Sequence, residues 1–225
     1  MESSGTSSKS RSRPSNRNDD APSVTPLLPL LLLETLRDMD RPEEVLEDED
    51  ISVSMPRRLG LSEVVRLQIQ RFEEEVRSRR PQVPSQIEDL FRLVIRRPDC
   101  EEIFREAGRR VAERYWSQRS NGMRRLIRFL PRPLALVAAQ RAGRRMFKEL
   151  VGRSRFRITR RPAGLHIDSS LTARADPGGA ACAFYSGVFA ALLKLYTGRR
   201  YRVLHIACGA RTAGGPCEWS VELAE

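Results

Sequence analysis

Lysine is nearly absent from this chain, although the chain is strongly basic. Of its 40 lysine and arginine residues only Lys9, Lys148 and Lys194 are lysines, and the formal net charge is +11. Aromatic residues make up only 6% of the chain. A basic chain without aromatic residues interleaved among the charges lacks the usual pattern of a nucleic-acid-binding surface. This composition therefore argues against nucleic acid as the main partner, and a GC-rich genome accounts for the arginines.

An uninterrupted apolar run of membrane-spanning length is also missing from the first part of the chain. The leucine-rich run at residues 26–33 is interrupted by Pro29 and is far shorter than the roughly 20 residues that a spanning helix needs. The first 20 residues contain no apolar stretch behind a basic start, which a secretory signal would require. We therefore expect a cytoplasmic chain without a transmembrane segment, in which residues 26–33 act as a docking segment.

Charge is divided unevenly along the chain. Residues 1–50 hold 6 basic and 12 acidic side chains, a balance of −6, so the remainder carries +17. Residues 1 to about 24 are rich in Ser, Arg, Asn and Pro, a composition typical of disorder. Residues 34–50, with nine carboxylates, read as a solvated acidic linker or as a segment that folds back on the arginine-rich body. We expect a disordered tail over residues 1–55 and a single domain over residues 56–225.

Hydrophobic periodicity predicts the fold class. Apolar residues recur every three or four positions and predict helices over residues 61–76, 85–95, 99–115, 134–151 and 180–196, while a further segment opens at Gly122 and breaks at Pro131. The second of these begins with Ser85-Gln-Ile-Glu88, which has the pattern of a capping box. Alternating residues predict strands over 156–158, 165–169, 201–207 and 218–223. The order predicts an α+β domain: N-terminal helices, then a β-β-α-β-β unit forming one antiparallel sheet packed by helices.

Potential metal ligands are concentrated near the end of the sequence. Three of the four cysteines and one of the two histidines occur there, as Cys182, His205, Cys208 and Cys217. Two ligands at a strand end, a third returned by a hairpin and a fourth at a helix start can meet at one centre. Three thiolates and an imidazole satisfy tetrahedral zinc and leave no position for a substrate water. The helix N-terminus is expected to favour the thiolate form of Cys182.

The same residues allow a second interpretation. Cysteine is among the most buried residue types, so three buried thiols and a hydrogen-bonded core histidine would also suit a small hydrophobic domain. Cys100 stands apart on a predicted helix and is interpreted as an ordinary thiol.

The segments around the four ligands resemble the 4-vinyl-reductase domain family of the TRAPP-like superfamily. The resemblance rests on Cys182-Ala-Phe-Tyr-Ser-Gly187, His205-Ile-Ala-Cys208-Gly209 and Cys217-Glu-Trp-Ser-Val221. The chain departs from the family pattern at His205, where metal-binding members carry a carboxylate. The family includes sensory domains of bacterial regulators that bind small aromatic hydrocarbons, and proteins linked to bacteriochlorophyll synthesis.

The resemblance implies a zinc-containing, ligand-binding domain that forms homodimers or signals to a partner protein. It also implies an apolar ligand pocket between sheet and helices, with Trp116 and His166 as further candidates for a polar contact. The pocket residues that it suggests are Phe184, Tyr185, Ser186, Phe189, Leu192 and Val203.

Catalytic motifs are missing from the sequence. Neither a nucleophile elbow nor a phosphate-binding loop is present, so we expect a binding or sensory module rather than an enzyme. Two alternatives remain: an accessory protein in tetrapyrrole reduction, and a basic adaptor for nucleic acid or acidic partners.

Overall fold

The computed structural model describes residues 24–40, 63–152, 154–160, 163–211 and 215–224. The helices before the sheet are α1 (Leu27–Met39), α3 (Glu63–Arg77), α4 (Pro84–Val94), α5 (Cys100–Ser117), α6 (Asn121–Arg128) and α7 (Arg132–Leu150). The strands and remaining helices are β1 (Phe156–Arg160), β2 (Ala163–Ile167), α8 (Leu171–Ala175), the 3-10 helix η1 (Ala180–Cys182), α9 (Ala183–Thr197), β3 (Tyr201–Ala207) and β4 (Cys217–Leu223).

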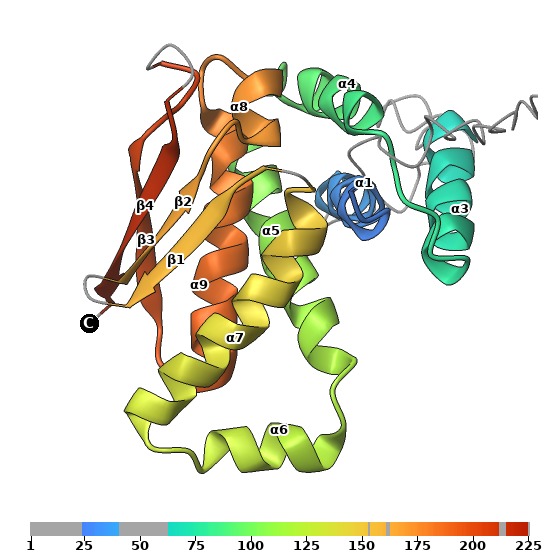
Figure 1. Cartoon of the computed structure of the whole chain (residues 1–225). Helices are drawn as coiled ribbons and strands as arrows, with labels where there is room; N and C mark the ends of the chain where they lie inside the picture. The colour runs from blue at the N-terminus through green and yellow to red at the C-terminus, as the bar shows by residue number, and fades with distance from the viewer. Residues whose placement is uncertain (1–23, 41–62, 153, 161–162, 212–214, 225) are drawn as a thin grey trace, which may run out of the picture.

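The four strands form one sheet in the order β1-β2-β4-β3, and every neighbouring pair is antiparallel. Helices α5, α7 and α9 lie on one face of this sheet, and no described helix covers the other face (Figure 1). The α+β class, with N-terminal helices followed by a single antiparallel sheet, is thereby confirmed.

An irregularity in β3 sets the direction of the residues that follow it. His205 pairs with Trp219, but Ala207 pairs with Glu218, so the register shifts between His205 and Ala207. In a regular strand, residues three apart point to opposite faces. The extra residue of a bulge reverses that relation, and His205 and Cys208 come to the same side of the sheet.

Helices α5 and α9 cross at unusually short range through two glycines. A Cβ added to Gly108 would lie 2.1 Å from the carbonyl oxygen of Phe184, and one added to Gly187 would lie 2.0 Å from that of Arg105.

Around this crossing α9 is buried almost throughout. It is also the one helix of the described chain that is long and apolar enough to cross a membrane, and 72% of the window Ala180–Thr197 is buried within the fold.

Helix α1 corrects the expected domain boundary. The sequence places residues 1–55 in a disordered tail, yet α1 lies in the fold with its leucines buried. Leu28 and Leu32 are both fully buried in the main core, while Leu30 and Leu33 pack with Ile69 and Phe72 of α3. The folded body therefore includes residues 24–40. Residues 1–23 and 41–55 of the expected tail lie outside the described residues.

Two local predictions also differ from the structure. Helix α4 begins at Pro84 with Val83 at its N-cap and no side-chain cap, so the predicted capping box at Ser85 is wrong. Strand β2 ends at Ile167 rather than at Ser169, because Ser169 adopts a φ of 48° and the next residue, Ser170, caps α8. Serine is a favourable N-cap residue, and here the hydroxyl oxygen of Ser170 accepts a hydrogen bond from the amide of Ala173.

Candidate metal site

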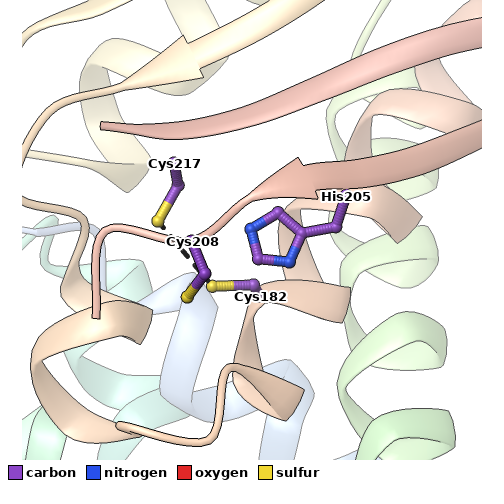
Figure 2. Close-up of side chains that lie close together, drawn as sticks. All are labelled: Cys182, His205, Cys208 and Cys217. Atoms are coloured by element: carbon purple, nitrogen blue, oxygen red, sulfur yellow. Dashed lines mark hydrogen bonds between the residues drawn. The ribbon is translucent and has the colours of Figure 1, made fainter. Parts of the chain in front are cut away.

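Four side chains from separate elements converge at one end of the sheet. Cys182 ends η1, His205 lies in β3, Cys208 follows β3 directly, and Cys217 opens β4. One ligand atom from each lies within 4.8 Å of all the others. Figure 2 shows the three sulfur atoms and the imidazole ring directed toward a common point. The three cysteines are buried and His205 is half-buried.

The turn before Cys182 holds that cysteine in place. Asp176 is buried, and its two carboxylate oxygens accept hydrogen bonds from the amides of Gly178 (2.8 Å) and Ala181 (2.7 Å). Gly179 has a φ of 83°, a conformation that glycine adopts without steric cost. A Cβ at Gly179 would stand 3.1 Å from the sulfur of Cys208. The Asp-Pro-Gly-Gly sequence thus brings η1 directly under the end of β3.

Polar groups surround the sulfur atoms. The hydroxyl of Thr172 lies 3.2 Å from Sγ of Cys182, and that of Ser170 lies 3.3 Å from Sγ of Cys217. The amide of Gly209 donates to Sγ of Cys217 at 3.3 Å. Hydroxyls and amides at this range stabilise a thiolate and hold it in one orientation. The sequence interpretation did not select Ser170 and Thr172, although a serine directly before a short helix is a recognisable cap.

The hydrogen bond between Cys182 and Cys217 shifts the pKa values of the two thiols in opposite directions. The hydrogen bond from Cys182 lowers the pKa of the Cys217 thiol well below its ordinary value; burial opposes this, and the nearby His205 imidazole, the Ser170 hydroxyl and the Gly209 amide reinforce it. The same bond and burial raise the pKa of Cys182. Between these two cysteines the polar contacts favour the thiolate at Cys217, while the effect of the helix N-terminus on Cys182 stays a prediction.

The donor set fits a tetrahedral metal ion. The sulfurs of Cys182 and Cys217 are 4.0 Å apart and form no disulfide. A tetrahedron with metal-sulfur bonds of about 2.3 Å has edges of about 3.8 Å, close to that separation. Nε2 of His205 is buried and has no hydrogen-bond partner. A buried polar atom without a partner is costly, and coordination of a metal would remove that cost.

The expected pocket residues are divided between the core and the surface. Phe184, Tyr185 and Phe189 are buried in the aromatic core, where Tyr185 packs edge-on against Trp219 with ring centroids 5.7 Å apart. Ser186 and Val203 line a depression of about 420 Å³ that also includes His205.

Leu192 borders a separate depression beside Trp116 and Tyr196. The six residues therefore do not line one chamber.

The other residues singled out in the sequence, Trp116, His166 and Cys100, lie outside the cluster of four metal ligands. Trp116 packs against Tyr196, with ring centroids 4.9 Å apart. His166 stands on the open face of the sheet, where its Nδ1 is 3.3 Å from a carboxylate oxygen of Glu218. Cys100 is half-buried, as expected for a thiol outside the cluster.

No family model, curated protein sequence or solved structure matches this chain.

Proposed function

We propose that this chain is a non-catalytic binding domain whose C-terminal hairpin is fixed to the buried helix by a zinc ion. The observation that carries the proposal is the convergence of three buried sulfurs and an imidazole within 4.8 Å. Sulfur-rich tetrahedral sets are characteristic of structural zinc. All four positions would be filled by protein, so the ion would organise the fold rather than activate a substrate.

A small, mostly apolar molecule with one polar group is the proposed ligand class, in keeping with the resemblance to 4-vinyl-reductase sensory domains. Two observations support it. The hydroxyl of Tyr185 and Nε1 of Trp219 are buried without hydrogen-bond partners, and their rings are in contact inside an aromatic core. Buried polar atoms are nearly always paired in native proteins. A phenol-like molecule entering beside these rings would supply the missing partner.

Metal analysis of the purified full-length chain tests the metal site. We expect stoichiometric zinc, and cobalt substitution should give the intense absorption of thiolate-to-metal charge transfer. Cys208→Ser should lose most of the bound metal, whereas Cys100→Ser, which removes the cysteine outside the cluster, should retain it. Zinc present at a thousand times its dissociation constant stabilises a fold by about 4 kcal/mol, so a chelator should lower the unfolding midpoint clearly.

Two outcomes would count against different parts of the proposal. A wild-type chain that contains no stoichiometric transition metal and does not bind cobalt overturns the zinc site. Native mass spectrometry examines the ligand separately, through the mass of any molecule retained from expression. A zinc-loaded chain that retains no small molecule and gains no thermal stability from phenol or toluene overturns the ligand class and leaves the metal site standing.

A further inference from the structure

Helix α6 is attached to the rest of the molecule by few side chains. It is capped by Ser120, whose hydroxyl accepts from the amide of Met123, and Ile127 is its one buried residue. In Figure 1 the helix lies across the lower end of the molecule, opposite α4. The surface formed by residues 121–134, here called the α6 corner, is therefore presented to solvent rather than packed into the core.

Large apolar side chains are exposed at the α6 corner. Phe129 is 85% exposed, Leu126 60%, Leu134 52% and Met123 45%. Around the helix, Met123 and Leu126 continue the apolar side that begins with Ile127, because successive residues turn by about 100°. Single exposed apolar residues are normal on protein surfaces, but four within one short segment mark an interaction site.

The charge of the same region has one sign. Between Glu113 and Glu149 the sequence contains nine arginines and one lysine, and no aspartate or glutamate. Arg125, Arg128 and Arg132 are exposed within the α6 corner. Among the described residues no carboxylate forms an ion pair with these three, although the arginines of α5 nearby are paired with glutamates of their own helix. The corner thus combines unpaired positive charge with exposed apolar side chains.

We propose that the α6 corner binds the surface of an anionic membrane. Phe129 and Leu126 would enter the boundary between headgroups and acyl chains, while Arg125, Arg128 and Arg132 contact lipid phosphates. Amphipathic helices with arginine on one side and Phe or Leu on the other bind membranes in this manner. Nucleic acid would use the same arginines but gains little from aliphatic side chains, because single-strand binding relies on aromatic stacking.

Vesicle flotation with the full-length, metal-loaded chain tests this inference. We expect binding to vesicles of phosphatidylcholine with phosphatidylserine, a loss of binding as salt rises, and little binding to phosphatidylcholine alone. Arg125→Gln, Arg128→Gln and Arg132→Gln together should weaken binding by roughly 100-fold, since each basic residue near an anionic surface contributes a factor of about five. Leu126→Ser with Phe129→Ser should weaken it by at least about tenfold.

The matched control variants remove the same number of arginines and of apolar side chains, but from surfaces outside the α6 corner. Arg157→Gln, Arg199→Gln and Arg200→Gln remove three exposed arginines from other surfaces, and Leu93→Ser with Ile206→Ser removes two side chains that are 60% and 61% exposed. Both should bind vesicles as the wild type does. The inference is overturned if anionic vesicles are not bound at low salt, or if the controls weaken binding as much as the corner variants. It is also overturned if single-stranded nucleic acid is bound while vesicles are not.

Discussion

At the scale of single residues, the candidate site depends on side chains that do not touch the metal. Thr172 is fully buried, and its hydroxyl contacts Sγ of Cys182 and the hydroxyl of Ser170. This pair of hydroxyls links α8 to the sulfur atoms of Cys217 and Cys182. Such partners orient metal ligands and commonly matter almost as much as the ligands themselves.

Replacing Thr172 by valine tests that role, since valine keeps the shape and removes the hydroxyl. We expect the zinc affinity of Thr172→Val to fall by roughly 10- to 100-fold, measured by competition with a chromophoric chelator. Thr197→Val is the matched control, because Thr197 donates to the carbonyl of Leu193 at the far end of α9. Equal affinities for both variants would show that the threonine hydroxyl does not support the site.

The four ligands could be predicted from residue type and spacing, and their convergence is confirmed. The groups around them could not. The contribution of Gly209 is a main-chain amide, which leaves no side-chain signal in the sequence. The bulge that turns Cys208 toward His205 is a property of the pairing between β3 and β4. The strand predicted from the sequence ends at Ser169 and no element is predicted for Ser170 and Thr172, so their hydroxyls were not expected at the sulfurs.

At the scale of elements, the crossing of α5 and α9 is the contact most sensitive to side-chain size. The neighbour of each missing Cβ is a backbone carbonyl, which cannot move as a flexible side chain can. Any larger residue at Gly108 or Gly187 must therefore push two buried helices apart. This crossing also fixes the start of α9, and through it the position of Cys182.

Gly187→Ala should destabilise the fold by about 3 kcal/mol or more, as overpacking of a rigid contact does. Gly122→Ala provides the control, because nothing lies within 4 Å of a Cβ added there, and alanine should be neutral or stabilise α6 by up to about 1 kcal/mol. Urea unfolding of both variants gives the comparison. A Gly187→Ala chain as stable as the wild type would mean that the helices separate at no cost.

Helix α1 was not predicted from the sequence. Its leucine run was interpreted as interrupted by Pro29, but Pro29 is the third residue of the helix. Proline is tolerated in a first turn, where the amide it lacks would have no intrahelical acceptor. The helices and strands with clear periodicity were predicted close to their observed bounds, because burial on one face imposes that periodicity. Helix α8, with only five residues, is too short to show it.

At the scale of the whole molecule, ion pairs hold the end of α1 to the arginine-rich body. Asp38 pairs with Arg110 at 2.6 Å, and Arg97 lies between Asp40 and Asp99 at 2.7 and 2.8 Å. The expectation that the acidic segment folds back on the body is met at Asp38 and Asp40. The rest of that segment, residues 41–50, lies outside the described residues.

Acid should weaken this attachment. Burial raises the pKa of Asp38, but hydrogen bonds and charge from Arg110 and Arg37 more than offset it, so the pKa lies below its ordinary value. A depressed pKa contributes stability that is fully present above the unfolded value, about 4, and is lost as pH falls through the folded value.

The variant Asp38→Asn should be less stable than the wild type by up to about 1 kcal/mol near neutral pH, since its pair with Arg110 is partly exposed. That difference should shrink toward zero as the pH falls below about 4. Comparing the two proteins at each pH removes the effect of zinc release, which acid causes in both. Asp89→Asn, which breaks an exposed pair within α4, should not remove an attachment of α1. A difference that is constant with pH would contradict the assignment.

The burial of α1 has a consequence for the way this protein is made. Leu28 and Leu32 leave the ribosome well before α5, the helix that α1 packs against, has been synthesised. The nascent chain therefore exposes the apolar surface of α1 until the residues up to the end of α5, at Ser117, have been synthesised. Chaperones that cover exposed apolar segments would have their greatest influence on yield during that interval.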